Sequence, residues 1–340
     1  MQAKNPKQRY FSHLSRFDEK LNKSIEENKK NPLTSLGHLL YINDGRTPFF
    51  YLQGLARIEI KANINDAMAK DWLINFKKIE DAFGKYDYWY TMIENNKRWK
   101  FPSEIEKYFD QQANFYLGVI EERLIHQGWI TRDLNGYKKS EKAVTDFKNQ
   151  IKNAEWHKPE KEASKLAKLF RDEAQEIHDK INEQEIDLDH LELGIHEFRR
   201  KLRWLSIYSS ALLGKIILST NNSKDPLSRY LTKSNQEFKF NQLPENAKIE
   251  YPVKFLRGGF YAISEIISVI GNIKDPGLST AEMLHLCALY GMSENQVAKH
   301  LGADYYPHTK VVDDAKEYIQ KLILVENVLQ HTADYFDKQS

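Results

Sequence analysis

The spacing of apolar residues in steps of three and four is the feature that most limits how this chain can fold. Near the N-terminus it includes Phe11, Leu14, Phe17 and Leu21, and this spacing places apolar side chains on one face of an α-helix. The same period returns in most later segments, whereas runs that alternate apolar and polar residues, as strands do, are lacking. The sequence therefore predicts an all-α protein built of antiparallel helix bundles.

The chain has 340 residues, which exceeds a typical single domain and favours two halves. We expect an N-terminal helix and extension over residues 1–34, a first helical-bundle half over 35–155 and a second over 156–340. Two helices are predicted within residues 49–94, and Ser103 with Glu106 indicates a capping box at the start of another. Residues 221–252 are polar and contain three prolines, so a loop is expected there. Three further helices are predicted after it, within residues 254–273, 279–291 and 313–337.

The composition excludes several classes of protein. Hydrophobic residues make up 41% and charged residues 29%, as in folded rather than disordered proteins. The net charge is only +2, so any site for an anion has to be a local concentration of Lys and Arg. Cys287 is the only cysteine, which excludes an intrachain disulfide and a multi-thiolate metal site; we expect it to be buried. There is no signal-peptide pattern and no run of about 18 apolar residues, so a cytoplasmic protein is expected.

The segment 191–213 carries the most informative pattern. His196, Arg199, Arg200 and Arg203 have helical spacings of zero, three, four and seven, which places all four on one face. One interpretation is a solvated charged face, and the other is a site for an anion. Guanidinium groups stay charged and their forked donors match phosphate oxygens, so a row of them suits an extended polyanion.

Other chemistry finds less support in the sequence. His190 and His196 are six residues apart and no HExxH motif is present, while the neighbouring arginines disfavour a metal cation and a protonated imidazole at His196. P-loop, GxSxG and kinase motifs are also missing. Residues 291–303 share the spacing of some helix-turn-helix DNA readers, but the near-neutral charge disfavours DNA binding. We find no catalytic constellation, which favours a role other than catalysis.

The segment HEFRRKLRWLSIY, residues 196–208, resembles the CHAD family of conserved-histidine α-helical domains. Helices of that family carry a histidine followed by arginines three and seven residues later, which His196, Arg199 and Arg203 match. The resemblance implies two similar helical-bundle halves that face a central basic pocket or channel. It also implies binding of inorganic polyphosphate.

The first half contains a weaker version of the same pattern. In FFYLQGLARIEIKANI the resemblance assigns basic positions to Arg57 and Lys61, and in LINFKKIEDAFGKYDYWY it matches Lys77 and Lys78 followed by a glycine and an aspartate, Gly84 and Asp87. Gln53 or Gly54 stands where the histidine is expected, and Glu59 reduces the local positive charge.

Three hypotheses follow from the sequence. The first is a non-enzymatic, CHAD-like protein that binds polyphosphate or another phosphate-rich anion in a basic groove formed by these eight residues: His196, Arg199, Arg200, Arg203, Arg57, Lys61, Lys77 and Lys78. The second is a degenerate helical scaffold that acts through protein association, favoured by the missing histidine and the low net charge. The third is an enzyme that acts on phosphorylated substrates, with His196 as phosphate acceptor or acid/base. No cofactor, metal or membrane is implied, and the oligomeric state is left open.

Overall fold

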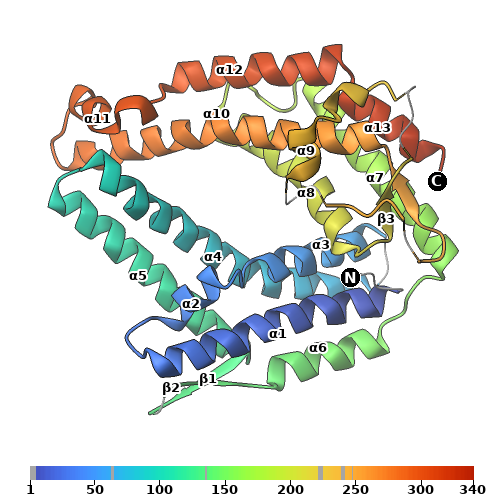
Figure 1. Cartoon of the computed structure of the whole chain (residues 1–340), viewed down its shortest axis with the longest axis horizontal. Helices are drawn as coiled ribbons and strands as arrows, with labels where there is room; N and C mark the ends of the chain where they lie inside the picture. Colours follow the sequence, from blue (N-terminus) through green and yellow to red (C-terminus); the bar gives the residue numbers. More distant parts are fainter. Residues whose placement is uncertain (1–4, 63–64, 135, 221–224, 239–241, 247) are drawn as a thin grey trace. The chain divides into compact units, whose positions relative to one another are not determined.

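The computed structural model describes residues 5–62, 65–134, 136–220, 225–238, 242–246 and 248–340. It confirms the predicted all-α fold, because the described elements other than helices are two small two-stranded sheets (Figure 1). The chain divides into an N-terminal unit, Asn5–Trp156, and a C-terminal unit that contains His157–Ser340. None of the helices among the described residues is long and apolar enough to cross a membrane.

The N-terminal unit consists of helices and one β-hairpin. Its elements are α1 (Pro6–Lys30), α2 (Leu36–Ile42), α3 (Thr47–Lys61), α4 (Asp66–Trp99), α5 (Ser103–His126), β1 (Ile130–Asp133), β2 (Gly136–Lys139) and α6 (Lys142–Asn153). Figure 1 shows α4 and α5 side by side as a long helical hairpin. β1 and β2 pair antiparallel, with Ile130 opposite Lys139.

Aromatic residues form the core of the N-terminal unit. Phe17 of α1 lies 4.5 Å from Phe49 and 4.9 Å from Trp129, measured between ring centroids, and Trp129 stacks on Phe147. All four rings are buried, and burial of large rings contributes much of the core free energy. The prediction sets residues 1–34 apart as an extension, whereas α1 is part of this core because its apolar face packs on α3.

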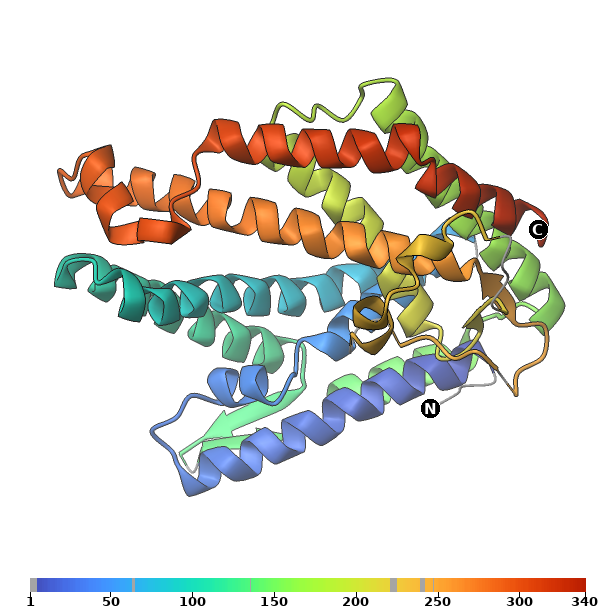
Figure 2. The same cartoon turned by 45° about the horizontal axis from the view of Figure 1, so that its top comes forward.

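The C-terminal unit has helices of more varied length and type. Its elements are α7 (Pro159–Asn182), the π-helix η1 (Leu191–His196), α8 (Glu197–Ala211), β3 (Ile216–Leu218), η2 (Ser228–Tyr230), α9 (Lys233–Glu237), β4 (Val253–Phe255), α10 (Arg257–Leu289), α11 (Glu294–Leu301), η3 (Gly302–Asp304), α12 (His308–Gln320), η4 (Lys321–Val325) and α13 (Val328–Asp337). β3 and β4 pair in parallel. Figure 2 shows α10 and α12 running side by side. The rings of Phe170, Phe255 and Phe336 form the core between α7, β4 and α13.

Several predicted boundaries differ from the structure. The two helices expected in 254–273 and 279–291 are one continuous helix, α10, which passes through Pro276. The single helix expected in 313–337 is divided, because Asn327 has a positive φ of 50° between η4 and α13. Ser103 starts α5 without a side-chain capping bond, so the predicted capping box is wrong. The predicted loop 221–252 contains η2 and α9, and its residues 221–224, 239–241 and 247 lie outside the described residues.

Candidate anion-binding site

The π-helix η1 brings the chain into α8, the helix that carries the predicted basic face. The backbone amide of Ile195 donates to the carbonyl of His190 five residues earlier, at 3.1 Å, which is the π-helical bond. A Cβ at Gly194 would lie 1.6 Å from the carbonyl oxygen of Asp187. Only glycine at this position therefore permits the backbone at Asp187 to pack against the π-helical turn. This turn ends at His196, directly before α8.

Arg199 lies across helix α10. Its Nε donates to the backbone carbonyl of Ile267 at 2.8 Å, and a Cβ at Gly271 would lie 2.7 Å from its Nη2 atom. Glycine at position 271 thus allows the guanidinium group to approach the helix, and the Ile267 carbonyl fixes its orientation. Of the five N–H donors of the guanidinium group, this contact uses one.

His196 lies one helical turn before Arg199 and is half-buried. Its Nδ1 atom is buried and has no hydrogen-bond partner among the described residues. The pKa of His196 is lowered, first by burial and then by the positive charge of Lys274, against which Glu192 acts; Arg200 and Arg199 lower it further. The sequence predicted the effect of the arginines, but burial and a lysine of α10 contribute more. The charges that act on this imidazole are thus mainly positive.

Arg200 and Arg203 occupy the same helix in different surroundings. Arg200 is 60% exposed and its Nη2 atom lies 2.5 Å from Oε2 of Glu197, so part of its charge is neutralised. Arg203 is half-buried. Phe198 and Leu202 are fully buried on the apolar side of α8, which confirms the predicted division of this helix into an apolar and a basic side.

Lys274 is a residue that the sequence analysis missed. It is 3% exposed and forms an ion pair with Asp275. Position 274 is four residues after the buried Ile270 and three before the buried Gly277, so it lies on the buried face of α10. The sequence signal for Lys274 was its helical spacing from apolar residues, which places it on the buried face. Such a lysine is unusual, because lysine is rarely fully buried unless it is paired.

The basic residues predicted in the first half lie on two helices of the N-terminal unit. Arg57 and Lys61 are one turn apart on α3, half-buried and exposed respectively. Lys77 and Lys78 are exposed on α4, and the amino group of Lys77 lies 2.6 Å from both carboxylate oxygens of Asp81. These four residues and the four of η1 and α8 thus belong to different units.

A cluster of ion pairs around Arg46 lies in the N-terminal unit, close to Gly84. The Arg46 guanidinium group donates to Glu80 and to Asp87, each at 2.9 Å. Tyr41 donates a hydrogen bond to Asp87, and Gln53 lies 3.5 Å from the other oxygen of Glu80. Gln53, one of the two residues at the approximate position expected for the histidine of the first half, is buried beside a carboxylate, so this cluster is an ion-pair network within the unit.

The other predicted features give no competing site. Among the residues that the structure describes, no group of three or more His, Cys, Asp or Glu side chains is placed to hold a metal ion. Cys287 is buried, as predicted, and burial raises the pKa of its thiol to about 11. The segment resembling a helix-turn-helix contains the short helix α11, in which Val297 and Leu301 are buried. Comparison of the chain with protein-family models, with curated proteins and with solved structures gives no match.

Proposed function

We propose that this chain is a divergent CHAD-like protein that binds inorganic polyphosphate or another phosphate-rich anion on the basic side of α8. The observation that carries the proposal is the position of Arg199, which is fixed against Gly271 of α10 by the Ile267 carbonyl. Its contact with α10 places a cation one helical turn from His196 without a carboxylate partner within the described ranges. The proposed contacts to the anion come from His196, Arg199, Arg200 and Arg203.

The electrostatics of this region suit an anion better than a cation. Lys274 is too buried to touch a large ligand, but its charge acts on His196. An anion beside His196 would offset this charge and supply an acceptor for the imidazole. Arginine donors spaced by one turn also match successive phosphate groups better than a single small anion.

Titration calorimetry with long-chain inorganic polyphosphate at low and high salt tests the proposal. We expect the affinity to fall as salt rises, because binding of a polyanion releases counterions. Replacing both arginines, Arg199→Ala with Arg203→Ala, should weaken binding by about a hundredfold or more, since each charged hydrogen bond contributes about 1.5–3 kcal/mol.

A control with the same loss of charge separates this site from a general effect of net charge. Arg171 of α7 pairs with Asp172 and Asp337, and Lys310 of α12 pairs with Asp314. The variant with Arg171→Ala and Lys310→Ala should therefore bind nearly as the wild type does. Equal binding by the two double variants would contradict the proposal and leave the protein-association hypothesis.

We also propose a cytoplasmic location. The support is the use of cysteine: Cys287 is the only one, and it is a buried thiol.

A further inference from the structure

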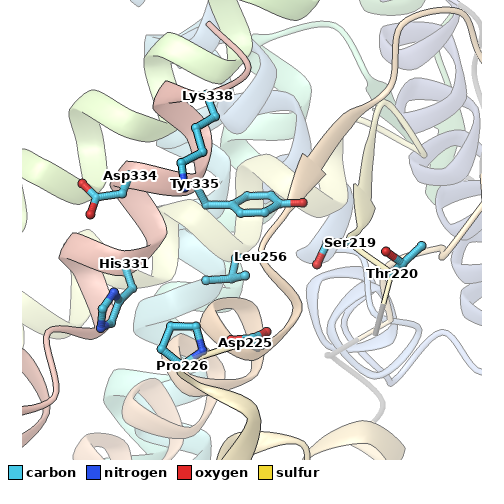
Figure 3. A pocket seen from close by; sticks show the side chains of 9 residues that line it. All are labelled: Ser219, Thr220, Asp225, Pro226, Leu256, His331, Asp334, Tyr335 and Lys338. Atoms are coloured by element: carbon cyan, nitrogen blue, oxygen red, sulfur yellow. The ribbon is translucent and has the colours of Figure 1, made fainter. Parts of the chain in front are cut away.

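A separate cavity of about 310 Å³ lies in the C-terminal unit, between α13 and the chain segments that follow β3 and precede α10. Figure 3 shows its walls. One wall is formed by Ser219, Thr220, Asp225, Pro226 and Leu256, and the other by His331, Asp334, Tyr335 and Lys338. A volume of this size is at the lower end of the range for small-molecule sites.

The α13 wall presents one face of that helix. Residues 331, 334, 335 and 338 have the spacings zero, three, four and seven, so their side chains leave the helix on the same side. In Figure 3 the Tyr335 ring extends beside Leu256 with its hydroxyl toward Ser219 and Thr220, and Lys338 folds back toward Tyr335. The cavity thus combines an apolar surface with polar groups at its edges.

The carboxylates of the cavity already have donors. Asp225 is buried, and its two oxygens accept from the backbone amides of Leu227 and Gly258, each at 2.9 Å. Gly258 lies in the first turn of α10, where the helix dipole favours negative charge. Asp334 accepts from Gln330 at 2.8 Å and points away from Ser219 in Figure 3. Donors of the chain itself thus bind both carboxylates, and Asp334 lies at the edge of the cavity.

The donors of the cavity are mostly unused. The side chains of Thr220, Tyr335 and Lys338 make no hydrogen bond within the described ranges of the chain. Ser219 is buried, and its oxygen accepts from the backbone amide of Arg257 at 3.0 Å, which leaves its hydroxyl proton available. Three hydroxyl donors and one ammonium group thus border an apolar surface.

We infer that this cavity binds a compact organic oxyanion, a carboxylate or phosphate monoester carried on an apolar body. The apolar body packs between the Tyr335 ring, Leu256 and Pro226. The oxyanion accepts from the hydroxyls of Ser219, Thr220 and Tyr335, and Lys338 supplies the compensating charge. This inference is independent of the polyanion proposal, because no residue is shared with the α8 site.

Calorimetric titration of the full chain with four small probes tests the inference. The probes are phenyl phosphate, benzoate, the neutral benzyl alcohol and inorganic phosphate. We expect phenyl phosphate or benzoate to bind best, and the difference between these two identifies the preferred head group. Inorganic phosphate lacks the apolar body and benzyl alcohol lacks the charge, so both should bind at least about tenfold more weakly.

Matched variants locate the binding. Lys338→Met and the double variant Tyr335→Phe with Thr220→Val should each weaken binding of the best probe by about tenfold, the loss of one or two good hydrogen bonds. Lys310→Ala, which removes a lysine of α12 that pairs with Asp314 outside the cavity, should leave it unchanged. Tightest binding by benzyl alcohol, binding that the first two variants leave intact, or no binding at millimolar concentration would each overturn the inference. Thermal unfolding of every variant checks that the fold is retained.

Discussion

Each unit of the chain places an arginine against a glycine of a long helix, and the two arginines differ in what they bind. A Cβ at Gly84 would lie 2.6 Å from Nη2 of Arg46, and one at Gly271 would lie 2.7 Å from Nη2 of Arg199. Arg46 is bound by two carboxylates, whereas Arg199 binds a backbone carbonyl and pairs with no carboxylate that the structure describes. The same local packing thus gives an ion-pair cross-link in which two carboxylates outweigh the arginine charge in one unit, and a cation with remaining donors in the other.

The largest expected effect is the loss of Arg46. The variant Arg46→Met should lower the free energy of unfolding by about 2 to 3 kcal/mol, because it leaves the Glu80 carboxylate buried without its ion pair. Glu80 has a side chain that is only 10% exposed. The matched variant Arg199→Met should cost about 1 kcal/mol, since it removes one hydrogen bond and leaves no buried charge.

Urea denaturation monitored by circular dichroism measures the free energy of unfolding of both variants. Polyphosphate titration of the same preparations should give the opposite order, with a loss of binding in Arg199→Met and none in Arg46→Met. Equal stability losses, or a binding loss in Arg46→Met, would remove the distinction between the two arginines.

Replacing Gly84 or Gly271 by alanine tests the same comparison with a smaller change, because the arginine is shifted and not removed. Alanine in a helix interior is favoured over glycine by about 1 kcal/mol, but at both positions its methyl group displaces a guanidinium group. In Gly84→Ala the displaced Arg46 leaves Glu80, so we expect a net loss of about 1 kcal/mol. In Gly271→Ala the gain and the loss should nearly cancel, while polyphosphate affinity falls severalfold because Arg199 is shifted. Unchanged affinity in Gly271→Ala would show that the position of the Arg199 guanidinium group against α10 is unimportant for binding.

The fold could be predicted from the sequence where apolar periodicity was unbroken. Helices α1, α3 and α4 follow directly from their repeating apolar residues. The continuity of α10 through Pro276 could not be predicted, because proline usually ends or kinks a helix. The structure shows tertiary support at this point: a Cβ at Gly277 would lie 2.4 Å from Val311, so α12 packs closely against the next residue. Local propensity is overridden there by packing that is invisible in a single sequence.

Only the part of the candidate site that lies on the segment of η1 and α8 could be predicted from the sequence. The spacing of His196 and Arg199 is a local property, whereas the structure places Arg199 against Ile267 of α10 and brings the charge of Lys274 to bear on His196. Lys274 could not be paired with His196 from sequence, because 78 positions separate them and the pairing depends on how α8 packs on α10. The difference between Arg46 and Arg199 was equally hidden, since it depends on which side chains the fold brings to each guanidinium group.

The pH dependence of stability and of polyphosphate affinity should distinguish His196 from the histidine of the N-terminal unit, His38. The lowered pKa of His196 means that the unfolded chain binds more protons than the folded chain between the two pKa values. Stability of the free chain should therefore fall as pH drops below about 6.5, the ordinary value for histidine. A bound polyanion favours protonated His196, so polyphosphate affinity should instead rise severalfold over the same range.

His38 of the N-terminal unit is the matched control. Burial lowers its pKa also, and its Nδ1 atom lies 2.6 Å from the Tyr86 hydroxyl. In calorimetric titrations across this pH range, His196→Gln should abolish most of the acid-induced gain in affinity and His38→Gln should retain it. A gain that persists in His196→Gln would assign the pH dependence to other groups.

The smallest expected effect concerns Lys77, which the sequence placed among the anion-binding residues. Lys77→Ala removes an exposed pair with Asp81, four residues later on the same helix, and such pairs contribute less than about 0.5 kcal/mol. Polyphosphate affinity should also be nearly unchanged, because Asp81 neutralises the charge at this position. Asp81→Asn sharpens the comparison, since it releases Lys77 from its partner. If that variant binds polyphosphate clearly more tightly than the wild type, the N-terminal unit has retained an anion-binding surface that its own carboxylates mask, as they do at Arg46.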